Sequence, residues 1–248
     1  MFRNSTLYSL TKVEAQKLLK KRSSKVLIGF YLFAVFALIL FYILAEITFG
    51  FNLYTGGQFV NASLANMMNF MLPLTALYLG AGSMNLDFRS GTIKNMYLLP
   101  VSREAIYIGK ILSVQGILGS LLLLQWFIAT LTAWIVEGSL NLSIGNYFGA
   151  FFIVLLINML AMSLSLFLKN VGLVILLAYG AYIGITLISF YLPAMKVISP
   201  AYVIGNYGKL FSLGAIPLLL TVLAYYIISF VTGLLLFEKK DENLCQFD

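Results

Sequence analysis

Apolar residues in this chain form long blocks, separated by shorter stretches that hold most of the charged residues. A helix that crosses a bilayer needs about 20 consecutive, mostly apolar residues. By this measure the sequence predicts an all-α membrane protein with one transmembrane domain over residues 1–248. Its six predicted spans cover residues 26–47, 64–86, 111–136, 147–168, 171–192 and 214–237.

The composition supports insertion into a membrane. Hydrophobic residues make up 61% of the chain and charged residues 10%, with a mean hydropathy of +0.95. A soluble domain typically carries about 25% charged residues. A soluble fold of 248 residues could not bury so much apolar surface, whereas the hydrocarbon core of a bilayer can absorb it.

The lysines and arginines divide unevenly between the two sides that six crossings create. Only Lys196 and Lys209 fall on one side. Because cytoplasmic segments carry the excess of Lys and Arg, we expect both termini in the cytoplasm. This distribution also accounts for the net charge of +7, so we expect no nucleic-acid partner. The basic residues on the predicted cytoplasmic side are Arg3, Lys12, Lys17, Lys20, Lys21, Arg22, Lys25, Arg89, Lys94, Arg103, Lys110, Lys169, Lys239 and Lys240.

Two segments outside the spans have patterns of their own. Residues 1–25 predict a helix at the cytoplasmic interface, with lysines toward the lipid headgroups. The alternative is a charged segment that only directs insertion, because Glu14 and Lys21 interrupt the apolar arc of this helix. Residues 193–213 are too broken by Pro and Gly to span and too apolar for a solvated loop. They predict a re-entrant or interfacial hairpin on the external side.

The sequence lacks the patterns of a catalytic or metal centre. It has no histidine and one cysteine, Cys245, which argues against zinc and transition-metal sites. Residues 205–210 come nearest to a nucleotide-binding P-loop, but the string is too short and lacks the hydroxyl residue. We therefore expect no catalytic, cofactor-binding or metal-binding residue. We also expect no Asp, Lys or Arg buried in the spans, so an active transporter would need a partner for its energy.

Five amide side chains lie within or near the predicted spans. We expect them to bond one helix to another rather than to contact a substrate, because polar groups in a bilayer favour partners on neighbouring helices. They are Asn66, Asn69, Gln115, Gln125 and Asn158.

The segment of residues 87–110, between the second and third spans, is the most informative part of the chain. Gly91 is expected to end the preceding helix and Thr92 to cap a short helix over residues 93–99, which Pro100 stops. Ser102 is then expected to cap the third span, with an acidic residue in its first turn. A short helix across the ends of two spans is well placed to dock in a groove of a soluble partner.

This segment resembles the permease subunits of type-two ATP-binding-cassette (ABC) transporters. In that family a carboxylate, Gly-Thr, a leucine-rich turn ending in Pro-Val-Ser-Arg, and Gly-Lys lie between spans two and three. The first position is Asp87 here, where glutamate is commoner. The family also has six spans, both ends inside, an interfacial N-terminal helix and an external hairpin before span six. The expected ATPase-coupling residues are Asp87, Arg89, Gly91, Thr92, Tyr97, Leu98, Leu99, Pro100, Ser102, Arg103 and Lys110, and Val101 and Gly109 also match the motif.

The resemblance implies a permease that pairs with a second permease, identical or sister. Each permease would bind a separate ATPase subunit, which holds ATP and Mg²⁺, through the loop helix. Members export or extract peptides, antibiotics, lipids or polysaccharides, and several small ones serve in antimicrobial-peptide export or self-protection. We therefore expect an exporter of a peptide, antimicrobial or other amphipathic compound in a bacterial plasma membrane. A membrane-embedded enzyme or maturation protein and a membrane scaffold or sensor are the alternatives.

Overall fold

The computed structural model describes residues 2–49, 58–89, 91, 101–138, 142–168, 170–212 and 214–245, and all their regular structure is helical. Five of the described helices are long and apolar enough to cross a bilayer, and the number is six when the bent pair α3–α4 is counted as one broken span rather than as a re-entrant segment. The prediction of an all-α membrane protein is confirmed. The five are α2 (Arg22–Phe49), α6 (Arg103–Glu137), α7 (Ile144–Phe167), α8 (Val171–Tyr191) and α10 (Ile216–Cys245).

The second span is not the continuous helix over residues 64–86 that the sequence predicts. It consists of α3 (Gln58–Asn69) and α4 (Met71–Arg89), whose axes meet at 47°. Pro73 explains the break, because proline has no N–H and its ring displaces the carbonyl four residues earlier, that of Asn69. Beyond the break, the Leu74 N–H donates to the carbonyl of Phe70 at 3.0 Å. The helix therefore resumes at once in a new direction.

The third span begins eight residues before its predicted start. The Ser102 hydroxyl accepts a hydrogen bond from the Ala105 N–H at 3.3 Å, and Glu104 lies in the first turn of α6. Both features were predicted for a cap at this position. The start of the span differs from the prediction because α6 runs without interruption from its cap into the apolar block. Lys110, predicted at the end of a loop, lies two turns inside the helix.

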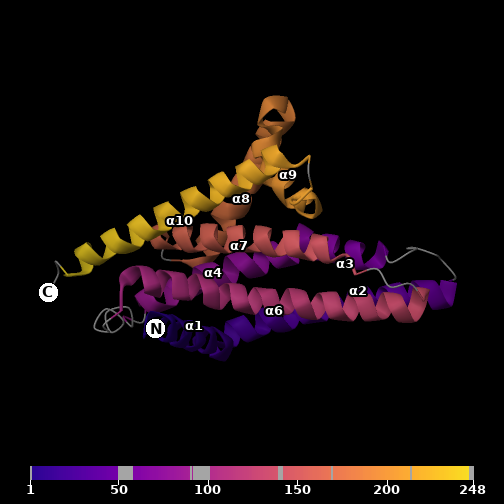
Figure 1. Ribbon diagram of the computed structural model, residues 1–248, viewed down its shortest axis with the longest axis horizontal. Coiled ribbons are helices and arrows are strands. Elements are labelled where there is room, and N and C mark those ends of the chain that lie inside the picture. Colours follow the sequence, from indigo (N-terminus) through magenta and orange to yellow (C-terminus); the bar gives the residue numbers. More distant parts are fainter. Residues whose placement is uncertain are drawn as a thin grey trace.

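One end of the bundle gathers elements that are distant in sequence. Figure 1 shows α1 (Phe2–Lys20) and the C-terminal part of α10 at the same end of the long α6. The ring of Phe237 in α10 lies 6.4 Å from that of Phe88 in α4 and 5.7 Å from that of Tyr107 in α6. We call this end of the bundle the α1 end. The start of α2 and the end of α10 therefore lie at the same end of the bundle, as an even number of membrane crossings requires.

Helix α7 is the central element, since it packs against α4, α6 and α10. Amide side chains join it to its neighbours. The Asn158 amide donates to the carbonyl of Ile111 at 3.4 Å, and the Gln115 amide donates to the carbonyl of Phe151 at 3.1 Å. Gln125 of α6 donates to the Ser63 hydroxyl of α3 at 3.3 Å. The prediction of helix-to-helix bonding is confirmed for these three amides.

The segment predicted as a hairpin consists of three short helices, η1 (Pro193–Ile198), α9 (Pro200–Gly205) and η2 (Tyr207–Lys209). It folds back on the bundle, and the side chains of Val203 and Tyr207 are buried. Its backbone presses on α7 at Gly149, where a Cβ would overlap the Tyr207 carbonyl. Helix α8 contacts α4 and α7 but is mostly exposed, and Val174 is its one buried residue.

Candidate functional site

Four charged side chains from three helices meet at the α1 end. The Lys110 ammonium of α6 lies 2.9 Å from Glu14 Oε2 of α1 and also pairs with the Asp87 carboxylate of α4. The Lys17 ammonium of α1 lies 3.0 Å from Glu14 Oε1 and 3.6 Å from Asp87 Oδ1. We call Glu14, Lys17, Asp87 and Lys110 the charge cluster. With two ammonium and two carboxylate groups, its net charge is zero.

Three members of the charge cluster are closed off from solvent. Lys110 is 0% exposed, and Glu14 and Asp87 are each 4% exposed, whereas the Lys17 side chain remains 40% exposed. An isolated charge in such a place costs several kcal/mol, and only a close opposite charge offsets that cost. Removing one buried partner is therefore expected to cost about 3–5 kcal/mol of folding free energy. The three helices are held in a single relative arrangement as a result.

Gly109, beside Lys110, lies where α6 contacts α1. A Cβ built on Gly109 would lie 3.5 Å from the Cβ of Leu10 and 3.9 Å from the backbone nitrogen of Thr11. A larger side chain at this position would displace α1. One turn past Glu14 on α1, Leu18 is 2% exposed and belongs to the core. Gly109 thus packs on α1 and Lys110 pairs with Glu14 of α1, so both residues of the Gly-Lys pair contact that helix.

The predicted coupling residues divide into three groups. Asp87 and Lys110, at the two ends of the predicted segment, are brought together in the charge cluster. Gly91 has the left-handed φ of 66° expected of a residue that ends a helix, and Ser102 caps α6. Arg103 opens α6 and its side chain is exposed, while Arg89 is the last residue of α4. Thr92, Tyr97, Leu98, Leu99, Pro100 and the predicted helix over residues 93–99 lie outside the described residues.

The sequence analysis missed Glu14 and Lys17 as members of the site. It also placed Asp87 and Lys110 in a loop, one residue outside the predicted spans, whereas both are buried side chains of α4 and α6. One signal was available, because Glu14 interrupts the apolar arc that faces the bundle. A carboxylate on a buried helix face needs a partner, and the pattern does not say which of sixteen basic residues supplies it.

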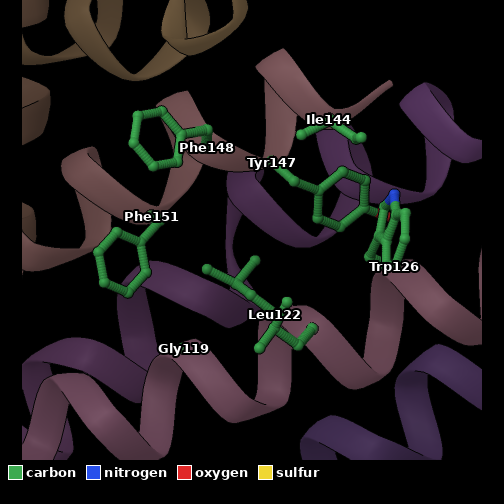
Figure 2. Close-up of a pocket in the computed structure, with 8 residues that line it drawn as sticks. Gly119, Leu122, Trp126, Ile144, Tyr147, Phe148 and Phe151 are labelled. Carbon is green, nitrogen blue, oxygen red and sulfur yellow. The ribbon is translucent and has the colours of Figure 1, made fainter. Parts of the chain in front are cut away.

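A cavity of about 340 Å³ lies between α6 and α7, away from the charge cluster. Figure 2 shows Trp126 and Tyr147 together at one side of it and Phe148 and Phe151 at the other, with Leu122 between them. The polar atoms of its wall are already paired. The Trp126 indole N–H donates to the carbonyl of Leu142 at 2.6 Å, and the Tyr147 hydroxyl donates to that of Val60 at 3.4 Å. This α6–α7 cavity therefore suits an aliphatic chain, without selection for a polar group.

Comparison with known families places these features in a wider context. A family model described as ABC-2 family transporter protein matches residues 10–195, three quarters of the 248 residues. The matched region includes all four residues of the charge cluster and both halves of the broken span. A comparison with curated proteins finds no match. The chain belongs to the ABC-2 family of transporter proteins and is a multi-pass membrane permease of an ABC transporter.

Proposed function

We propose that the chain is the permease subunit of an ATP-driven exporter and that a separate ATPase subunit docks on residues 87–110. The observation that carries this proposal is the charge cluster. Asp87 and Lys110 stand at the two ends of that segment and are both bonded to α1 or to each other in a buried place. An ATPase that pushes on this segment would therefore push on α1, α4 and α6 together, because the charge cluster joins these three helices.

The proposed coupling follows from the rigidity of the cluster. Coupling free energy travels through packed elements and through networks of ion pairs. Separating a buried pair is costly, so α1, the end of α4 and the start of α6 would move as one unit. Closure of the ATPase subunits around ATP and Mg²⁺ would drive this unit and change access to the translocation path. ATP and Mg²⁺ bind to the partner in this scheme.

The orientation of the permease is part of the proposal. The α1 end faces the cytoplasm, where ATP is available, and the segment of residues 193–213 lies on the external side of a bacterial plasma membrane. The distribution of Lys and Arg supports this orientation, since only Lys196 and Lys209 fall on the far side. The N-terminal lysines, among them Lys12 and Lys20, lie on exposed positions of α1 from which they can reach lipid headgroups.

A second permease, identical or sister, completes the path across the membrane in this scheme. The compound exported is a peptide, an antimicrobial or another amphipathic or apolar molecule. The cavity between α6 and α7 supports this choice, because the residues that line it are apolar or aromatic and none is charged. Charged hydrophilic substrates would find no counter-charge there.

The test is to purify the full chain from its native membrane under mild conditions and identify what is bound. The proposal predicts an ABC ATPase subunit in the complex, and hydrolysis of ATP that requires Mg²⁺ and that subunit. The chain freed of its partner should hydrolyse no ATP. A complex without an ABC ATPase, or ATP hydrolysis by the chain alone, would contradict the proposal.

A further inference from the structure

The broken span leaves polar groups at the break without hydrogen-bond partners in the described part of the chain. Because Pro73 has no N–H, the carbonyl of Asn69 lacks the donor that a continuous helix would supply. The side-chain amide of Asn69 is exposed, and within the described part of the chain no hydrogen bond forms to it. At the same break the carbonyl of Phe70 accepts a hydrogen bond from the Tyr179 hydroxyl of α8 at 3.2 Å. Helix α8 is thus tied to the break itself.

A cavity of about 240 Å³ adjoins the break, between α4, α7, α8, α9 and α10. We call it the break cavity. One face of α8 forms a wall, with Ala178 and Ala181 leaving space beside Tyr182. On another side Pro200 and Ile204 of α9 close it. None of the residues that line the break cavity is charged.

A hydrogen bond joins the segment of residues 193–212, which closes the cavity, to the last span, α10. The Tyr225 hydroxyl of α10, which also lines the cavity, donates to the carbonyl of Ile198 at 2.7 Å. The Tyr182 hydroxyl, in contrast, has no hydrogen-bond partner in the described part of the chain. The cavity therefore presents two open polar groups, the Asn69 amide and the Tyr182 hydroxyl, on an otherwise apolar wall.

The position of these two polar groups along their helices determines the free-energy cost of leaving them without hydrogen bonds. Asn69 is the twelfth residue of α3, about 17 Å from the start of that helix at a rise of about 1.5 Å per residue. Tyr182 lies near the middle of α8, which begins at Val171. In a bilayer whose hydrocarbon core of about 30 Å is crossed by α3–α4 and α8, both groups would lie below its surface. A polar group left unpaired there costs free energy that a ligand with a hydrogen-bonding group would recover.

We propose that the break cavity is a substrate site, in which Asn69 and Tyr182 bind an uncharged polar group of the transported compound and the apolar wall holds its hydrophobic part. This inference rests on the export function proposed above. The absence of charged residues from the wall excludes a charged group at this depth, because nothing there would offset its desolvation. The class of ligand is an apolar molecule or side chain that carries a hydroxyl or amide.

The α6–α7 cavity supplies an internal comparison. Its polar atoms are paired, so it should accept an aliphatic chain with or without a hydroxyl. The break cavity should distinguish the two. Of these two cavities in the described part of the chain, the break cavity has unpaired polar groups with which to recognise a compound, and the α6–α7 cavity does not.

The experiment uses the purified full chain in detergent and two photoactivatable probes, dodecanol and dodecane that each carry a diazirine. After illumination, mass spectrometry measures how much of each probe is attached to α4 and α8, which line the break cavity, and how much to α6, which lines only the α6–α7 cavity of the two. The variants are Asn69→Leu, Tyr182→Phe and the cavity-filling Ala181→Phe. Asn66→Leu is the matched control, since Asn66 is exposed one turn earlier on α3 and does not line the cavity.

In the wild-type chain the alcohol should label the break cavity about tenfold more than the alkane, the ratio that one or two neutral hydrogen bonds produce. Asn69→Leu with Tyr182→Phe should bring the two probes to equal labelling, and Ala181→Phe should remove both. Asn66→Leu should behave as wild type. Equal labelling of α6 by both probes in every variant shows that the fold is intact.

Equal labelling of the wild-type break cavity by the two probes would overturn the proposal and leave a cavity for lipid chains only. An effect of Asn66→Leu as large as that of Asn69→Leu would overturn it as well. The measurement needs no ATPase, so its failure leaves the export function standing. If the chain binds no ATPase but its break cavity still prefers the alcohol, the export function is contradicted and the binding site is retained.

Discussion

The ammonium of Lys110 and the carboxylate of Glu14 lie 2.9 Å apart, although 96 residues separate them in the sequence. Their contact joins the first helix of the chain to the helix that follows the proposed ATPase dock. Because Lys110 is 0% exposed, this bond is made where water cannot replace either partner. Helix α1 is therefore a docked part of the bundle, which goes beyond both the interfacial helix and the insertion signal that its sequence predicts.

Removal of one member of the charge cluster should be far more harmful than removal of a neutral pair. Glu14→Gln leaves a net charge of +1 in the cluster and Lys110→Met leaves −1, and each should lower the free energy of unfolding by about 3–5 kcal/mol. The double variant leaves Lys17 with Asp87 and no net charge. It should lose about 1–3 kcal/mol less than the sum of the single losses.

Equilibrium unfolding in detergent micelles measures these differences. Lys12→Met is the matched control, because Lys12 is an exposed lysine of the same helix, and it should change stability by less than about 0.5 kcal/mol. Strictly additive losses for Glu14→Gln and Lys110→Met would mean that the two side chains do not interact.

The packing of the 193–212 segment on α7 should depend on Gly149. Gly149→Ala places a methyl group on the Tyr207 carbonyl and should destabilise the fold by about 1–3 kcal/mol, as overpacking of a core does. Gly145→Ala is the control, since nothing lies within 4 Å of a Cβ at that position one turn earlier on α7. Thermal unfolding of the two variants, with limited proteolysis near Lys196 and Lys209, makes the comparison. If both variants behave alike, the segment does not pack on α7 as described.

The proposed orientation can be checked with single cysteines in a chain whose own cysteine is removed by Cys245→Ser. A membrane-impermeant maleimide added to intact cells should label Lys196→Cys and leave Lys12→Cys unlabelled until the membrane is opened. Both positions are exposed in the structure. The opposite pattern would place the α1 end outside and remove the ATPase from reach of residues 87–110.

Much of the fold could be predicted because membrane spans are selected by the length of their apolar blocks. The bounds of α7 and α8 fall within three residues of the prediction. The start of α6 was missed, because Lys110 precedes the predicted apolar block while the helix already begins at Arg103. The break in the second span was missed because a hydropathy average counts side chains only. It contains no information on the backbone N–H that Pro73 lacks.

The candidate site was predictable only in part. A motif within one loop points to Asp87 and Lys110 because its residues are contiguous. Glu14 joins them through tertiary contact alone, and a single sequence contains no measure of that distance. The burial of Lys110 could not be predicted either, since a lysine near a span end is ordinarily expected to extend its ammonium to water. Here Glu14 and Asp87 supply the counter-charge instead.

The most direct test of the coupling account is the amount of ATPase subunit that co-purifies with the full chain when the loop is changed. The variant Leu98→Ala, Leu99→Ala, Arg103→Ala alters the proposed dock, and Leu123→Ala, an exposed apolar residue of α6 outside it, is the control. The account predicts that the triple variant retains its fold but loses bound ATPase by about tenfold or more, as removal of the central residues of an interface does. The control should keep the wild-type amount. Wild-type amounts of ATPase on the triple variant would contradict the assignment of residues 87–110 as the dock.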